Sequence, residues 1–162
     1  MNASYKSITH FPLVSIIVTT KNEERNIANC LKSILNSQSL IEIIVVDNNS
    51  TDGTVEIAKR YTNNVYNFGP ERSAQRNFGI KQANGKYILY LDADMILSEN
   101  VMSECVEKFN KWKMENGKKE LVAVYIPERI IGEGFWVKAR DFERSFYNAT
   151  CIDCGRLSKV ES

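Results

Sequence analysis

The chain has 162 residues, of which 43% are hydrophobic and 25% are charged, and its formal net charge is +1. These values are ordinary for one globular domain with a sizeable core, and the scattered basic residues exclude the concentrated basic face of a duplex-binding protein. No apolar run approaches the roughly 20 residues of a membrane-spanning helix, and residues 1–20 lack a signal-peptide pattern. We therefore expect a cytoplasmic protein with no membrane span and no nucleic-acid partner.

Strand and helix patterns alternate along most of the chain. The expected strands cover residues 13–20, 41–47, 64–68, 86–92 and 120–130, and the first two are β-branched apolar runs typical of strands buried on both faces. The first expected helix follows Asn22, which is suited to capping. The further expected helices cover 50–61, 70–83, 98–116 and 135–149. This alternation predicts an α/β fold with a mostly parallel sheet, helices on both faces and a single domain.

The cysteines indicate buried or reduced thiols. Cys30 and Cys105 lie on the apolar faces of two expected helices, as buried thiols do. Cys151 and Cys154 form a lone C-x-x-C pair, and His10 is the only histidine, so a zinc site would lack ligands. Two reduced cysteines are the simpler interpretation of that pair in a cytoplasmic protein.

Polar clusters follow three of the expected strands, at residues 19–24, 47–54 and 92–94. In mostly parallel sheets, ligands bind outside the carboxyl ends of the strands, so these clusters are expected to converge on one site. Asp92 and Asp94 are the most unusual pair, because two like charges so close together repel each other. A cation between them, or a proton retained by one, would relieve that repulsion.

The sequence lacks the loops that hold phosphates through backbone amides. Neither G-x-G-x-x-G nor G-x-x-x-x-G-K-[ST] is present, and G-x-S-x-G is absent as well. A bound diphosphate would therefore need another source of positive charge, and Mg²⁺ or Mn²⁺ held by carboxylates would supply it. The alternative is an aspartate-rich turn in which the side chains cap backbone amides, because a lone D-x-D motif is a weak signal.

Three segments together resemble glycosyltransferase family 2, whose domains have the GT-A (Rossmann-like) fold. They are "VSIIVTTKNEERNIANCLKSIL", "EIIVVDNNSTDGTVEIAKRY" and "AQRNFGIKQANGKYILYLDADM". The resemblance covers about residues 13–110 and weakens after them. It implies a nucleotide-diphosphate sugar as donor, a divalent metal held at the D-x-D motif, and inverting transfer to an acceptor hydroxyl on a glycan or a lipid-linked molecule.

The resemblance also implies roles for individual residues. Asp94 is expected to bind the metal, Asp92 to contact the ribose or the metal, and Asp47 to accept a hydrogen bond from the donor base. The remaining expected donor-binding residues are Thr19, Asn22, Glu23, Arg72 and Arg76. The alternative role of Asn22 is to cap a helix. The alternative for Arg72 is a position on the solvent-exposed face of a helix, with no ligand contact. Asp52 is expected to be a local cap.

The catalytic base is unknown from the sequence. Related enzymes place it downstream of a "GGFDE"-like stretch that this chain lacks, and Glu128, Asp141 and Glu143 are only weak candidates. We expect an N-terminal extension at 1–12, a nucleotide-sugar-binding core at 13–131, and an incomplete acceptor-side segment at 132–162.

Three functions are compatible with the residues. The first is a glycosyltransferase, located in the cytoplasm or at the inner face of the membrane through peripheral association. The second is a truncated or vestigial nucleotide-sugar-binding module without turnover, and it is expected to transfer sugar poorly. The third, a nucleotidyltransferase, is the weakest, because the glycine- and arginine-rich loop it needs after the first strand is missing.

Overall fold

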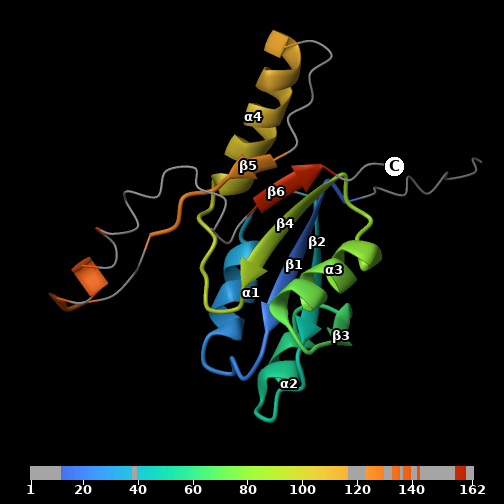
Figure 1. Cartoon of the computed structure of the whole chain (residues 1–162), viewed down its shortest axis with the longest axis vertical. Coiled ribbons are helices and arrows are strands. Elements are labelled where there is room, and N and C mark those ends of the chain that lie inside the picture. Colours follow the sequence, from blue (N-terminus) through green and yellow to red (C-terminus); the bar gives the residue numbers. More distant parts are fainter. Residues whose placement is uncertain are drawn as a thin grey trace, which may run out of the picture.

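The computed structural model describes residues 12–37, 40–116, 123–129 and 156–159, together with 133–135, 137–139 and 142. Strands and helices alternate through most of this part of the chain (Figure 1). The strands are β1 (Val14–Thr20), β2 (Ile41–Asp47), β3 (Val65–Asn67), β4 (Tyr87–Asp92), β5 (Ala123–Tyr125) and β6 (Arg156–Lys159). The helices are α1 (Ile27–Leu35), α2 (Thr54–Ala58), α3 (Arg72–Gln82) and α4 (Val101–Asn116).

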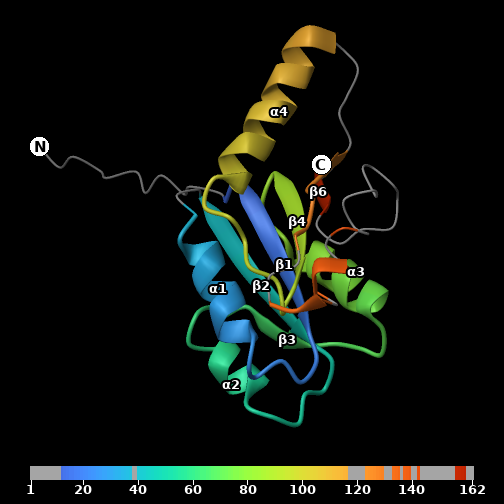
Figure 2. The ribbon, with the colours of Figure 1, turned by 90° about the vertical axis from the view of Figure 1, so that its left-hand side faces the viewer.

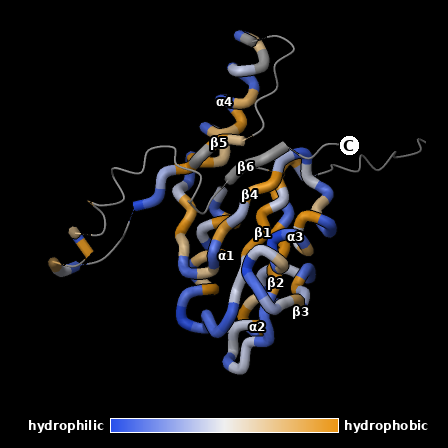
Figure 3. The backbone as a smooth tube through the Cα atoms, in the orientation of Figure 1, coloured by the Kyte–Doolittle hydropathy of each residue, from blue (hydrophilic) through white to orange (hydrophobic). Residues whose placement is uncertain are grey.

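The strands form one sheet in the order β3-β2-β1-β4-β6-β5. Neighbouring strands from β3 to β4 pair in parallel, and β6 pairs antiparallel with both β4 and β5. The predicted α/β fold with a mostly parallel sheet is therefore confirmed. The central strands β1, β2 and β4 are mainly hydrophobic along their length (Figure 3).

Helices cover both faces of the sheet (Figure 2). Alternate residues of β1 point to opposite faces, and the two apolar clusters divide accordingly. Ile16 packs in a cluster with Leu31 of α1 and Phe109 of α4. Ile17 packs on the opposite face with Ile44, against Phe78 of α3. Every residue of β1 is buried, as expected for the middle strand of a covered parallel sheet.

The ends of the sheet differ from the sequence prediction. Of the strand expected at 120–130, the structure describes residues 123–129, and among these only β5 is strand. The strand β6 was not predicted at all. Leu157 is the only apolar residue of β6, so the strand has no hydrophobic pattern to reveal it. Backbone pairing with residues 87–89 of β4 and 123–125 of β5 holds it instead. In the helix expected at 135–149, the described residues 135, 137–139 and 142 are helical, and the others lie outside the described residues.

The start of α1 also differs. The helix begins at Ile27, and Asn26, not Asn22, is the residue before its first turn. Asn22 has a positive φ of 55°, in the left-handed region that asparagine adopts more readily than most residues. The predicted capping role of Asn22 on this helix is therefore wrong, because the chain makes an extra turn between β1 and α1. The predicted burial of Cys30 and Cys105 is confirmed.

Close contact between α3 and β1 depends on a glycine. A Cβ atom on Gly79 would lie 2.5 Å from Cγ2 of Ile17, a distance that side-chain carbons do not tolerate. Ile17 is fully buried in the central strand and has no room to retreat. The absence of a side chain at position 79 therefore sets how near α3 lies to the sheet.

We predict that Gly79→Ala lowers the free energy of unfolding by about 1–3 kcal/mol, as overpacking of a core does. Alanine in a helix interior otherwise makes a protein more stable than glycine does, by roughly 0.5–1 kcal/mol. A loss of stability in Gly79→Ala would therefore show that the steric conflict with Ile17 is the larger effect. Urea denaturation followed by circular dichroism measures it. Asn77→Ala, at an exposed position of the same helix, is the control and should change stability by less than about 0.5 kcal/mol. A Gly79→Ala protein as stable as wild type would contradict the prediction.

Candidate functional site

The register of the parallel strands brings the predicted site residues together. Thr19 of β1 pairs with Asp92 of β4 on one side, and Thr20 pairs with Asp47 of β2 on the other. These pairs are the last ones of the two strand pairings, at the carboxyl ends of all three strands. Polar side chains therefore gather where the apolar core ends, which is where α/β sheets bind ligands.

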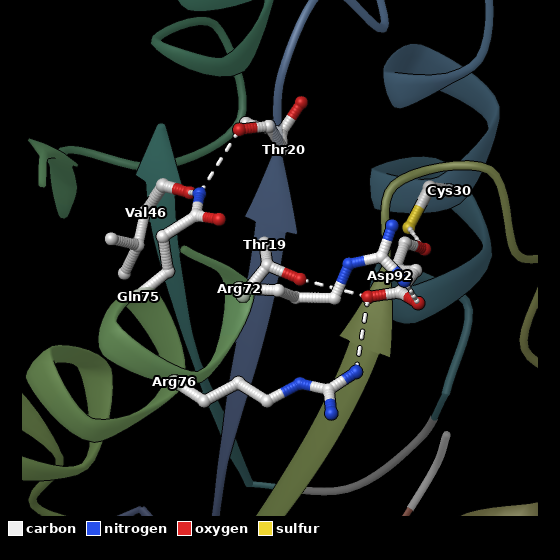
Figure 4. A network of polar contacts seen from close by, with 8 residues as sticks. All are labelled: Thr19, Thr20, Cys30, Val46, Arg72, Gln75, Arg76 and Asp92. Atoms are coloured by element: carbon white, nitrogen blue, oxygen red, sulfur yellow. Dashed lines mark hydrogen bonds and ion pairs between the residues drawn. The ribbon is translucent and has the colours of Figure 1, made fainter. Parts of the chain in front are cut away.

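Asp92 is the centre of a cluster of charged and polar side chains (Figure 4). Its Oδ1 accepts hydrogen bonds from Thr19 Oγ1 at 2.8 Å and from Arg76 Nη2 at 3.3 Å, and its Oδ2 accepts from Arg72 Nη1 at 3.2 Å. The Asp92 side chain is 10% exposed, whereas Arg76 and Arg72 are 26% and 64% exposed. One nearly buried carboxylate is thus matched by two guanidinium groups that reach toward solvent.

Asp94 lies in a different environment from Asp92. It is exposed, and within the described part of the chain no hydrogen bond or ion pair engages its carboxylate. The two aspartates of the D-x-D motif therefore differ in environment. The carboxylate of Asp92 is bonded to two arginines, whereas the carboxylate of Asp94 is exposed. This difference also resolves their repulsion, because the arginines offset the charge of Asp92.

Cys30 lies directly beside the motif. Its Sγ donates a weak hydrogen bond to the backbone carbonyl of Asp92 at 3.7 Å. Burial, together with the negative charges of Asp94 and Asp92, raises the pKa of the Cys30 thiol to about 12. The thiol is therefore neutral at physiological pH and packs under the motif as an apolar group.

Asp47 is buried at the end of β2, where it is 1% exposed. Ser50 supplies the hydrogen bonds that the described structure shows to its carboxylate. The Ser50 backbone N–H donates to Oδ2 at 2.8 Å, and the Ser50 hydroxyl donates to Oδ1. The predicted base-binding residue is thus fixed by its own loop.

Asn22 and Glu23 join the loop after β1 to the loop after β2. The Thr51 N–H donates to Asn22 Oδ1, and the Glu23 N–H donates to Thr54 Oγ1, each at 2.8 Å. The Asn22 N–H also donates to Ser50 Oγ at 2.8 Å. Their backbone and side-chain groups therefore hold the two loops as one unit.

Asp52 acts locally, as predicted. Its Oδ1 accepts from the N–H and the hydroxyl of Thr54, the first residue of α2, and its Oδ2 accepts from the Glu24 N–H at 3.2 Å. The hydrogen bond from the Thr54 side chain lowers the pKa of Asp52 below its usual value. These contacts place Asp52 at the start of a helix and in the junction between the two loops.

Sequence reasoning missed Gln75, which lies buried on α3 between the two arginines. Its Nε2 donates to the carbonyl of Thr20 at 3.0 Å and to the carbonyl of Val46 at 2.6 Å (Figure 4). The amide thereby connects the ends of β1 and β2 to the helix that carries Arg72 and Arg76. One signal was present, because Gln75 lies four residues before Gly79 and so shares its inward face.

The structure describes one of the three candidates for a catalytic base. Glu128 is half-buried three residues after β5. Asp141 and Glu143 lie outside the described residues. Their roles stay predictions.

Metal-binding clusters and membrane-spanning helices are both absent from the described residues. No three His, Cys, Asp or Glu side chains among them gather to hold a metal ion. No helix in this part of the chain has both the length and the hydropathy to cross a membrane.

A mostly parallel α/β sheet with polar side chains gathered at the carboxyl ends of its strands defines the class of open α/β proteins, which bind ligands at this edge. Within that class, the chain belongs to glycosyl transferase family 2, whose sequence model matches residues 15–156.

Individual relatives and structures agree with this family. The uncharacterized glycosyltransferase EpsJ of Bacillus subtilis is 31% identical over 158 residues, which cover 93% of this chain and 41% of EpsJ. The crystal structure of residues 1–349 of Staphylococcus aureus TarS with UDP-GlcNAc matches with a TM-score of 0.55 and 26% identity, over 74% of this chain and 38% of that one.

A third match is the mannosyltransferase PcManGT from Pyrobaculum calidifontis in complex with GDP-Man and Mn²⁺. It has a TM-score of 0.56 and 26% identity, over 74% of this chain and 37% of that one. The chain thus spans less than half the length of each of these three proteins. The structural matches confirm the predicted GT-A fold.

We predict that Gln75→Leu lowers the free energy of unfolding by about 1–3 kcal/mol, because two buried hydrogen bonds, to the carbonyls of Thr20 and Val46, are lost. Leucine fills a similar volume, so loss of the hydrogen bonds dominates. Thermal and urea unfolding measure the effect, with Gln82→Leu at the half-exposed end of the same helix as control. Equal stability of the two variants would show that the amide contributes nothing.

Proposed function

We propose that this protein transfers a sugar from a nucleotide-diphosphate sugar to an acceptor hydroxyl, with inversion at the sugar carbon and with the help of Mg²⁺ or Mn²⁺. The observation that carries the proposal is the pairing of an arginine-held Asp92 with an open Asp94 at the carboxyl edge of the sheet. Membership of glycosyl transferase family 2, and the UDP-GlcNAc and GDP-Man complexes of the matched structures, support it.

The charges of the cluster suit a diphosphate once a divalent cation is added. Arg72 and Arg76 contribute two positive charges, and Asp92 and Asp94 contribute two negative charges, so the four side chains sum to zero. A divalent cation makes the site doubly positive, which matches the two negative charges of a diphosphate diester. The exposed carboxylate of Asp94 is the oxygen ligand such a cation prefers, with phosphate oxygens completing its coordination.

Asp92 has a more restricted role than Asp94. A carboxylate offers about four acceptor positions, and the two arginines and Thr19 already occupy three of them. The remaining position on Oδ2 suits one ribose hydroxyl or one metal bond. Arg72, which is the more exposed arginine, is able to turn toward a phosphate without unfolding any element.

The chemistry requires charge stabilisation and proton removal. When bound, the cation would act as a Lewis acid toward the charge that develops on the departing nucleoside diphosphate. The arginines would add positive charge at the same place. A carboxylate base would remove the proton of the acceptor hydroxyl as it attacks from the side opposite the leaving group. Glu128, Asp141 and Glu143 are the candidates for that base.

The acceptor is proposed to be a glycan or a lipid-linked molecule of the cell envelope. TarS, one of the matched proteins, is named a poly(ribitol-phosphate) β-N-acetylglucosaminyltransferase, which supports a polymer as acceptor. A lipid-linked acceptor would place the protein at the inner face of the membrane by peripheral association. Binding of UDP-, GDP- and dTDP-sugars with and without Mn²⁺ tests the donor. An assay that separates sugar transfer from donor hydrolysis tests the activity.

We predict that Asp94→Asn removes the dependence of nucleotide-diphosphate binding on Mn²⁺, because the amide is a much weaker ligand for a hard cation. Isothermal titration calorimetry with and without Mn²⁺ measures it. Glu99→Gln, an exposed acid five residues further on, should retain the dependence. An unchanged metal dependence in Asp94→Asn would refute the proposed role of Asp94.

We predict that Asp47→Asn weakens nucleotide binding by about ten- to a hundredfold, which corresponds to the roughly 1.5–3 kcal/mol of a hydrogen bond to a charged group. The substitution keeps the shape of the side chain but replaces one acceptor oxygen with a donor. Titration of UDP, GDP and dTDP measures the effect. Wild-type affinity in the variant would exclude Asp47 from base recognition.

A further inference from the structure

Asp47 is oriented from one side only, by Ser50. The Ser50 N–H and hydroxyl donate to different oxygens of the carboxylate, so the plane of the carboxylate is fixed by two bonds from one residue. Asp47 is also 1% exposed, and water does not compete with these bonds. Each oxygen keeps one further acceptor position.

The Ser50 hydroxyl is in turn oriented by the loop after β1. The Asn22 N–H donates to Ser50 Oγ at 2.8 Å, which occupies an acceptor position of the hydroxyl. A serine hydroxyl has a single proton, and here it is directed to Asp47 Oδ1. The left-handed backbone of Asn22 presents its N–H in this direction. A chain of donors therefore runs from Asn22 through Ser50 to Asp47.

We propose that Ser50 is a positioning residue for recognition of the donor base, and that it makes the site selective for a base with a ring N–H. This inference rests on the proposed function, in which Asp47 meets the base. A carboxylate has only acceptor positions, and the two bonds from Ser50 fix the plane in which the remaining positions of Asp47 lie. Uracil, thymine and guanine carry a ring N–H at their Watson–Crick edge, whereas the corresponding nitrogen of cytosine is an acceptor and repels a carboxylate.

The experiment compares UDP, GDP, dTDP and CDP by calorimetry in the presence of Mn²⁺. We expect wild type to bind at least one of the first three more tightly than CDP. Ser50→Ala should narrow that preference by about tenfold, because the Asp47 carboxylate loses the bond from the hydroxyl and keeps only the bond from the backbone N–H of residue 50. Ser50→Thr keeps the hydroxyl and should restore the preference.

Thr54→Ala provides the matched structural control. Thr54 belongs to the same loop junction and contacts Glu23 and Asp52, but the described structure gives it no contact with Asp47. If a variant only loosens the loops, the affinity for all four nucleotides should fall by the same factor. If Ser50→Ala lowers the affinity for all four nucleotides by the same factor, as Thr54→Ala is expected to do, the positioning role of Ser50 is overturned.

A double-mutant cycle separates this inference from the proposed function. If Ser50 acts through Asp47, Ser50→Ala should change affinity by less than about twofold in an Asp47→Asn background, since coupled residues are non-additive. Full additivity would overturn the inference while leaving donor binding intact. Absence of binding of every nucleotide by wild type would overturn the proposed function, and the inference with it. Thermal unfolding of each variant verifies that it is folded.

Discussion

The in-register parallel pairing of β1 with β2 and β4 is the constraint on which the site depends. It places Thr19 beside Asp92 and Thr20 beside Asp47, although these residues are far apart in the sequence. The pairing is held by the burial of β1 on both faces, since its alternate residues serve two separate apolar clusters. The position of the polar residues is therefore a consequence of the core. A shift of one residue in register would exchange the two faces and separate the polar pairs.

Helix α3 adds the positive charge, and four of its residues determine where that charge lies. Gly79 allows the helix to approach β1, Gln75 attaches it to the ends of β1 and β2, and Arg72 and Arg76 reach Asp92. Spacing of three and four residues puts Gln75 within one turn of both Arg72 and Gly79. The arginines thus rest on a helix whose distance and rotation are both specified.

Much of the fold could be predicted from the sequence, because the strands at 13–20, 41–47 and 86–92 are apolar runs with clear limits. β6 could not be predicted, since only Leu157 is apolar and the pairing depends on distant strands. The turn at Asn22 was also missed, because its backbone conformation follows from bonds to Ser50 and Thr51 in another loop.

The position of the candidate site residues at the strand ends was predictable, and the environment of each side chain was not. The D-x-D motif gave no sign of how the surroundings of Asp92 and Asp94 differ, whereas the structure separates a carboxylate held by arginines from an exposed one. That separation depends on Arg72 and Arg76, which are close to Asp92 only in three dimensions. Gln75 was overlooked because its partners are backbone carbonyls, which leave no trace in the sequence.

The junction between the loops after β1 and β2 has a consequence for protein engineering. Asn22, Glu23 and Glu24 bond with residues 50–54 through backbone and side-chain groups of both loops. A loop transplanted from a relative would therefore bring donors and acceptors that match only its original partner. Segments 21–26 and 48–54 constitute one exchangeable unit, so a chimaera that replaces one of these loops has to replace the other with it.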